Sequence, residues 1–358
     1  RLGSGMYFIM ESGLKSLFME NNKKILKAVA PFHHPGYLNF KQAPFEAWKQ
    51  NGGMVAKDHF PPRFLHGVVY RWELPTMWRS RKEARLRFVE PVSLSFDSFP
   101  DYARYEVVPM FWDCWPCYFE KTAKWLLKYQ VKTAIFSSRQ TAELMRELLP
   151  HVHIIWCPEA VDDAVYQKGK LLKDREIDLL EFGRSNEKVF DANKLEAVFD
   201  KQVSLGKQSS LGKGGAAVGL NHVCTKQHGK FIYTNEQLFQ AMGNAKVTIA
   251  LPRSLTQPEM AGDIETLTQR YWECMFSRMV MVGHAPQELI DFIGYNPVIE
   301  LRDDISTEDL IRDVLEHVED YQALVDRNLE IAQRLGSWEV RMKWLMGELE
   351  KYYQAHEC

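Results

Sequence analysis

Short apolar segments typical of β-strands alternate with amphipathic helical segments along most of the chain. The clearest strand segments are Thr133–Ser137, His153–Cys157 and Ile177–Phe182, and helical stretches such as Gln140–Leu149 separate them. A helix between consecutive strands predicts parallel pairing, because a parallel connection must return along the whole length of the sheet. The pattern therefore predicts an α/β protein whose parallel sheets carry helices on both faces.

The alternation occurs in two runs, which join near Pro158–Asp174. The chain has 358 residues, which corresponds to roughly two domains at ~150 residues each. We therefore expect two doubly wound domains. Ligands of open parallel sheets bind at the carboxyl ends of the strands, so the predicted site is the cleft between the two domains.

Charge and composition exclude several classes of protein. The 47 acidic and 45 basic residues give a net charge of −2, which argues against a nucleic-acid partner, since such binders carry a basic excess.

The longest apolar runs, such as Val247–Leu251, are far shorter than a membrane-spanning helix, and Met6–Phe18 lacks the apolar core of a signal peptide. The six cysteines form no dense framework, so we expect a cytoplasmic protein.

Two glutamates, Glu265 and Glu273, lie eight residues apart in a helical segment. If the helix begins just after Glu265, then Thr266, Leu267 and Thr268 supply its first free backbone N–H groups. These donors and the helix dipole favour an anion such as a diphosphate. Glu273 then lies about two turns further on nearly the same side, where it can accept hydrogen bonds from sugar hydroxyls. A solvated helix with two ordinary glutamates is an equally open interpretation of the spacing alone.

A second group of polar residues follows the strand segment Ile177–Phe182. Gly183 and Arg184 come directly after it, and Lys188 lies four residues beyond Arg184. A glycine lets a ligand approach the backbone closely, an arginine offers a planar fork to phosphate, and a lysine adds a point charge. Taken alone, this pattern favours the alternative of a turn with solvated cations.

Together, these segments resemble glycosyltransferase family 4. The segment 179–188, LLEFGRSNEK, resembles the family's strand-Gly-Arg-x-x-x-Lys element, and 263–283 resembles its E-x7-E element with the turn and strand that follow. The segment 133–167 resembles the last N-terminal strands and the Pro-x-x-Val-Asp linker, and Trp338 resembles a tryptophan of the late C-terminal helix. The resemblance covers about 132–345, more than half of the chain.

The resemblance implies a GT-B fold and the transfer of a sugar from a nucleotide-sugar donor, usually with retention at the anomeric carbon. Carried over by position, Arg184 and Lys188 bind the donor diphosphate and stabilise the leaving group. Glu265 contacts the donor sugar, and Glu273 contacts the nucleotide ribose. The chain departs from the family at Thr268, where glycine is frequent.

The first 130 residues match the family poorly. The family has a glycine-rich loop facing the cleft after its first strand, and this chain has His33 and His34 there instead. These histidines either contact the acceptor or a phosphate, or make local hydrogen bonds within the loop. Asp113 follows the strand segment Tyr105–Phe111, and it either orients an acceptor hydroxyl or, as we favour, caps the next helix.

Basic and aromatic residues are mixed over Trp78–Phe88. Such a segment can make peripheral contact with the inner face of a membrane or hold a phosphate-bearing lipid acceptor, but a solvated helix face is the more frequent origin of a charge run. Directly beyond it, Val92–Phe96 is expected to form a strand.

Two further patterns bear on cofactors. No Asp-x-Asp sequence occurs in the chain, which agrees with a metal-independent site without a cofactor. Cys114-Trp115-Pro116-Cys117 resembles a thioredoxin redox motif, but the rest of that pattern is missing. We therefore interpret both cysteines as packing residues.

The combined expectation is a GT-B-type protein with two Rossmann-like, doubly wound domains facing a central cleft. An acceptor-binding domain spans 6–157, a nucleotide-sugar-binding domain spans 158–335, and a helix over 336–358 crosses back to the first domain. The expected activity is that of a glycosyltransferase in glycan or polysaccharide biosynthesis, acting on a glycan or lipid-linked glycan. The alternative is a non-catalytic GT-B-like protein that binds a sugar nucleotide or a partner protein.

Overall fold

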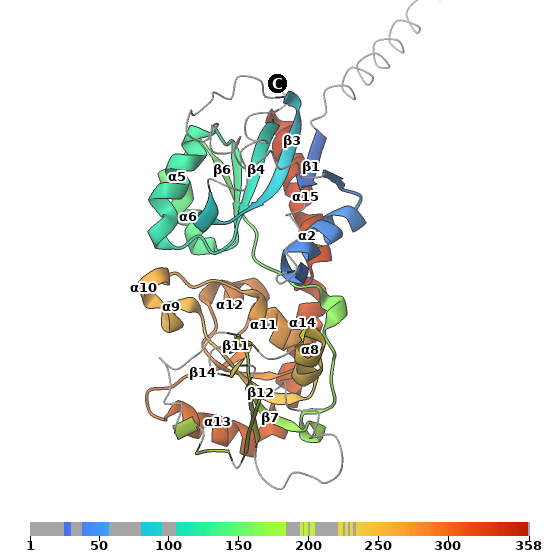
Figure 1. Ribbon diagram of the computed structural model, residues 1–358, viewed down its shortest axis with the longest axis vertical. Helices are drawn as coiled ribbons and strands as arrows, with labels where there is room; N and C mark the ends of the chain where they lie inside the picture. The colour runs from blue at the N-terminus through green and yellow to red at the C-terminus, as the bar shows by residue number, and fades with distance from the viewer. Residues whose placement is uncertain are drawn as a thin grey trace, which may run out of the picture.

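The chain folds into two α/β units that lie one above the other along the long axis of the molecule (Figure 1). The structure is a computed structural model. It describes residues 25–29, 38–56, 80–94, 105–183, 194–195, 197–199, 201–204, 221–224, 226–227, 230–231 and 234–356.

The first unit is built on a six-stranded sheet in the order β2-β1-β3-β4-β5-β6, in which every neighbouring pair is parallel. Its strands are β1 (Ile25–Val29), β2 (Met54–Ala56), β3 (Ser80–Val89), β4 (Tyr105–Phe111), β5 (Thr133–Phe136) and β6 (His153–Trp156). Its helices are α2 (Leu38–Gln50), α5 (Phe119–Lys128) and α6 (Arg139–Leu148). Alternate residues of the central strands enter two separate apolar clusters, one containing Val108 and Met110 and the other Val107 and Phe111. Both faces of the sheet are therefore covered, as predicted for a doubly wound domain.

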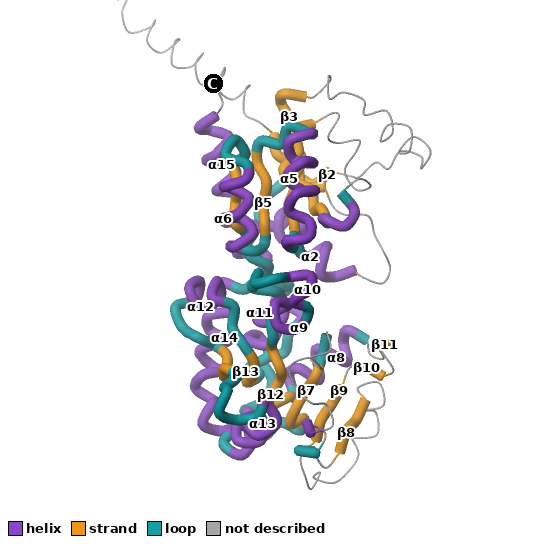
Figure 2. Tube along the Cα trace, turned by 90° about the vertical axis from the view of Figure 1, so that its left-hand side faces the viewer, coloured by secondary structure: helices purple, strands orange, loops and turns teal. Residues whose placement is uncertain are grey.

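The second unit repeats this plan with the order β14-β13-β12-β7-β9-β8, again parallel throughout (Figure 2). Its strands are β7 (Ile177–Glu181), β8 (Lys201–Ser204), β9 (Asn221–Cys224), β12 (Ala245–Ala250), β13 (Val280–Gly283) and β14 (Val298–Glu300), with a short antiparallel pair of β10 (Lys226–Gln227) and β11 (Lys230–Phe231). Its helices are α8 (Asn235–Gly243), α9 (Arg253–Thr256), α10 (Pro258–Ala261), α11 (Gln269–Phe276), α12 (Gln287–Ile293), α13 (Thr307–Glu316) and α14 (Gln322–Leu335). Leu180 and Met281 face one apolar cluster, whereas Leu179 and Val280 face the other.

The last helix, α15 (Trp338–His356), returns to the first unit and lies beside α2 (Figure 1). Trp338 stacks on Trp112 with ring centroids 5.5 Å apart, and the Tyr353 hydroxyl donates a hydrogen bond to Glu106 Oε1 at 3.0 Å. The chain passes between the units twice, after β6 and before α15. These two segments run side by side, because Val161 and Ser337 form a parallel bridge.

Two local predictions for the first unit are wrong. The basic segment Trp78–Phe88 is not a helix: from Ser80 onward it forms β3, which lies between β1 and β4 in the sheet. Arg87 is only 5% exposed and Arg85 pairs with Glu83 at 2.6 Å, so these two charges are not on a solvated helix face.

The expected strand Val92–Phe96 is also wrong for its described part. Pro91–Ser93 form a 3-10 turn, with the proline at its start, where the missing N–H and fixed φ suit the first turn of a helix. Residues 95 and 96 lie outside the described part of the chain.

Among the described residues, no helix is both long enough and apolar enough to cross a bilayer. The two cysteines of the Cys-x-x-Cys sequence differ in surroundings. Cys114 is buried, and burial raises its pKa to about 12, whereas Cys117 is exposed. The packing interpretation therefore holds for Cys114 only, and both thiols are free.

Candidate functional site

The carboxyl ends of the two sheets face each other across the boundary between the units. Beyond β5, Arg139 of the first unit contacts α12 of the second, and Asp113, beyond β4, lies 3.8 Å from Arg253, which follows β12. This is the edge at which ligands of open parallel sheets bind.

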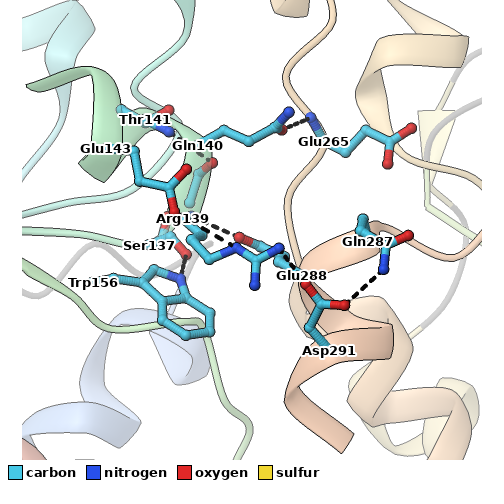
Figure 3. Close-up of polar contacts among 11 residues, drawn as sticks. Ser137, Arg139, Gln140, Thr141, Glu143, Trp156, Glu265, Gln287, Glu288 and Asp291 are labelled. Atoms are coloured by element: carbon cyan, nitrogen blue, oxygen red, sulfur yellow. Dashed lines mark hydrogen bonds and ion pairs between the residues drawn. The ribbon is translucent and has the colours of Figure 1, made fainter. Parts of the chain in front are cut away.

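Glu288, at the start of α12, joins the two units (Figure 3). Its Oε2 accepts a hydrogen bond from the backbone N–H of Arg139 at 2.6 Å, and its Oε1 accepts one from the backbone N–H of Leu267. The Arg139 N–H belongs to the first turn of α6, where backbone donors lack partners within the helix. Glu288 is 3% exposed, and burial raises its pKa to about 7 despite these hydrogen bonds.

A side chain of the first unit and one of the linker also hold the loop that precedes α11. The Glu265 N–H donates to Gln140 Oε1 at 2.7 Å (Figure 3). The Gln269 N–H donates to Glu159 Oε2 at 3.2 Å. The helix begins at Gln269 with Thr268 as its N-cap, three residues later than the segment after Glu265 predicts. The prediction that Leu267 presents a free N–H is therefore wrong, because Glu288 accepts its hydrogen bond.

The side chain of Glu265 points to a histidine that the sequence did not single out. His284 Nε2 lies 2.9 Å from Glu265 Oε1, and His284 Nδ1 lies 2.7 Å from Glu300 Oε2. His284 follows β13, and Glu300 ends β14, the next strand of the sheet. The only signal in the sequence is that both residues stand at strand ends.

Charge stabilises this row of three residues. Hydrogen bonds to Glu265 and Glu300 raise the pKa of His284 to about 10, so the imidazole is a cation at neutral pH. Partial burial opposes ionisation of Glu300, but hydrogen bonds from His284, the Ala285 N–H and Asn296 outweigh it and lower its pKa. The side chains of Glu265 and His284 are 26% and 36% exposed, so Glu265 is fixed in direction and still reachable by a ligand.

Glu273 lies within α11 and is buried at 8% exposure. Its Oε1 accepts a hydrogen bond of 3.0 Å from the Tyr166 hydroxyl, which comes from the linker between the units. Burial raises the pKa of Glu273, an effect that Tyr166 and Arg270 oppose.

Gly183 lies two residues beyond the end of β7, in a left-handed conformation with φ of 79°. A Cβ added there would lie 2.0 Å from Arg270 Nη2, so the Arg270 guanidinium lies directly against the glycine backbone. Arg270 of α11 is thus a cation beside the predicted diphosphate loop. The loop was predicted from the sequence, but this arginine was missed. Arg184 and Lys188 lie outside the described residues.

The predicted acceptor residues are placed only in part, because His33 and His34 lie outside the described residues. The favoured helix-cap role of Asp113 is wrong: the cap positions of the next two helical segments are Trp115 and Tyr118. Asp113 instead adopts φ of 52° and lies near Arg253, whose guanidinium stands 4.8 Å from the centre of the Trp115 ring.

A narrow pocket lies at the ends of β4 and β5. It is open to solvent and far smaller than the ~300–1,000 Å³ of typical ligand sites, so it cannot hold a nucleotide sugar alone. Its lining comes from both units: Phe111, Asp113, Cys114, Trp115, Phe136, Ser137, Ser138, Thr141 and Thr266.

Solved structures share this architecture over nearly the whole chain. Sucrose-phosphate synthase from Thermosynechococcus elongatus matches with a TM-score of 0.56 at 11% identity, covering 93% of this chain and 100% of that one. Anabaena HepE in complex with UDP-glucose matches with a TM-score of 0.55 at 10% identity, covering 91% and 99%. The chain therefore has the GT-B fold of two doubly wound domains. No protein-family model and no curated protein sequence matches it.

Proposed function

We propose that this protein is a glycosyltransferase that moves a sugar from a nucleotide-sugar donor to a glycan or glycolipid acceptor. The observation that carries the proposal is the fixed carboxylate of Glu265 at the carboxyl edge of the second sheet, held by His284 at 2.9 Å. A carboxylate fixed in direction and accessible to solvent can accept hydrogen bonds from sugar hydroxyls, and its position at the carboxyl edge of a parallel sheet, where ligands of such sheets bind, supports the proposal.

In this proposal the second unit binds the donor. Arg184 and Lys188 hold the diphosphate, Arg270 adds a third positive charge against Gly183, and Glu273 accepts hydrogen bonds from the ribose. Positive charge at this position stabilises the nucleoside diphosphate as it leaves, because negative charge develops there in the transition state. Transfer with retention and without a metal ion is part of the same proposal.

The first unit binds the acceptor in this proposal, with Asp113 and the histidines at 33 and 34 as the side chains that reach it. Closure of the units excludes water, which favours transfer over hydrolysis. We also propose a cytoplasmic location, which the free thiols of all five described cysteines support.

The test is a screen of the full chain against UDP-, GDP-, ADP- and dTDP-sugars by thermal shift and nucleotide release. UDP-glucose is the first probe, because HepE was solved with it. A donor at 100 times its dissociation constant should stabilise the protein by about 2.7 kcal/mol. Turnover that survives a chelator, and a product with the donor's anomeric configuration by NMR, would support metal independence and retention.

One observation favours a non-catalytic protein that binds a sugar nucleotide or a partner. The backbone N–H group of Leu267, which the proposed donor loop would offer to a phosphate, already donates to Glu288. Saturable donor binding without turnover, across several glycan and glycolipid acceptors, would establish this alternative and refute the enzyme.

A further inference from the structure

Three side chains with metal-ligating atoms converge on one face of the second sheet. β9 lies between β7 and β8 (Figure 2), and the register of β7 and β9 sets Glu181 opposite Cys224. Side chains alternate along a strand, so His222 and Cys224 project from the same face, and Glu181 joins them from the neighbouring strand. The ligand atoms of the three residues all lie within 4.8 Å of one another.

We propose that Glu181, His222 and Cys224 form a binding site for a divalent transition-metal ion, with Zn²⁺ as the best fit. Cys224 Sγ lies 3.3 Å from His222 Nε2, and Glu181 Oε2 lies 3.4 Å from the same nitrogen. With Zn–S bonds of about 2.3 Å and Zn–N and Zn–O bonds of about 2.0–2.1 Å, a tetrahedral ion separates its ligand atoms by about 3.3–3.6 Å. Two of the three separations therefore already match edges of a zinc tetrahedron, and the third, between Cys224 Sγ and the Glu181 carboxylate, is at most 4.8 Å.

The same contacts argue against a catalytic cysteine. In a nucleophile–histidine–acid relay the acid contacts the ring nitrogen opposite the nucleophile. Here Cys224 and Glu181 both approach Nε2, and Nδ1 lies 4.0 Å from the sulfur. The carboxylate, the imidazole and the thiol therefore surround one point, as the ligands of a bound ion do, and do not form a line.

The donor set selects the type of metal. A thiolate with an imidazole and a carboxylate suits Zn²⁺ and similar ions, whereas Mg²⁺ and Ca²⁺ prefer oxygen ligands only. His222 is 2% exposed and lies against Phe199 with ring centroids 5.3 Å apart, which fixes the imidazole. The Glu181 side chain is 21% exposed, so an ion can enter from that side and a fourth position can take a water molecule.

Metal binding at this site should also depend on pH. Thiolate, imidazole and carboxylate ligands must be deprotonated to bind a metal ion, so binding should release protons and the affinity should rise with pH.

The test uses the full chain, stripped with a chelator and titrated with Zn²⁺ or Co²⁺. We expect one saturable site per chain and, with Co²⁺, a thiolate-to-metal charge-transfer band with the intense visible bands of tetrahedral cobalt. Cys224→Ser should abolish the charge-transfer band. His222→Gln should weaken Zn²⁺ binding by more than the roughly 10–100-fold that losing an outer-shell partner costs. The matched controls Cys117→Ser and His151→Gln change exposed residues elsewhere and should bind like the parent.

A second measurement needs no variant of the site. Zn²⁺ should slow alkylation of Cys224 by iodoacetamide in the parent chain and leave the exposed Cys117 unaffected, as mapped by mass spectrometry. Absence of saturable binding, a cobalt band that persists in Cys224→Ser, or equal alkylation of Cys224 with and without Zn²⁺ would overturn the site. None of these readouts depends on sugar transfer, so the site stands or falls independently of the proposed activity.

Discussion

His284 Nε2 lies 2.9 Å from Glu265 Oε1, and this contact gives the proposed donor-sugar carboxylate its direction. The other ring nitrogen of His284 is held by Glu300 at 2.7 Å, so the imidazole is fixed from both sides. A neutral residue in its place loses the charge of this contact and holds Glu265 less firmly.

Replacing His284 by glutamine should therefore reduce sugar transfer by up to about 100-fold, since small errors in the position of a reacting group cost that much. The donor dissociation constant should rise together with the loss of turnover. His151→Gln, at an exposed position outside the site, is the control and should behave like the parent. Steady-state kinetics and donor titration measure both effects. Unchanged kinetics in His284→Gln would show that Glu265 does not depend on this contact.

The same histidine predicts a pH dependence of stability. Hydrogen bonds to Glu265 and Glu300 raise the pKa of His284 from 6.5 to about 10, so the folded state binds this proton more tightly than the unfolded chain. The contribution of protonated His284 to the free energy of unfolding is complete below pH 6.5 and is lost as the pH rises through 10. Between these limits the melting temperature of the parent should fall more steeply than that of His284→Gln. Parallel melting curves for the two proteins refute the assigned shift.

Sequence patterns predicted the parallel, doubly wound units because strand and helix periods are local properties. The predicted strand Thr133–Ser137 and the observed β5 differ by one residue. These patterns failed at β3, whose charged residues suggest a solvated helix. Arg85 lies over the Tyr105 ring of the neighbouring strand β4, and this partner is in place only once the sheet has formed. A charge run can be assigned to a surface only when its partners are known.

The site shows the same limit. Glu265 could be selected from the sequence because its spacing from Glu273 is visible along the chain. His284 and Glu300 could not be selected in this way, since their contacts depend on which strands are neighbours in the sheet. The order β14-β13-β12 brings the residues after β13 and at the end of β14 together, and no local pattern encodes that order. Glu288 was missed for the same reason, because its two backbone donors come from different units.

Removing the Glu288 side chain should destabilise the protein and loosen the contact between the units. Glu288→Ala leaves the Arg139 and Leu267 N–H groups without their acceptor, at a cost of about 2–6 kcal/mol for two donors. Urea unfolding measures the loss. Gln287→Ala changes an exposed neighbour on the same helix and should be nearly neutral. Equal stability of the two variants would show that water replaces Glu288 without cost.

Alanine substitutions at two glycines with positive φ distinguish the effect of backbone strain from the effect of displacing Arg270. Gly183 and Gly294 have φ of 79° and 86°, so alanine should cost about 1–2 kcal/mol at either position. Only at Gly183 would the new Cβ meet the Arg270 guanidinium, whereas nothing lies within 4 Å at Gly294. Gly183→Ala should therefore weaken donor binding and Gly294→Ala should not. If both bind donor like the parent, the position of Arg270 does not matter for the donor.

Two tryptophans of α15 test how strongly this helix holds the first unit. Trp338 is 2% exposed and stacks on Trp112, so Trp338→Ala should destabilise the protein by about 3–5 kcal/mol through the cavity that it leaves. Trp344 on the same helix is 42% exposed, and Trp344→Ala should change stability by no more than about 0.5 kcal/mol. Chemical denaturation followed by circular dichroism gives both values. A small effect at Trp338 would mean that its stack on Trp112, the residue directly after β4, contributes little to the hold of α15 on the first unit.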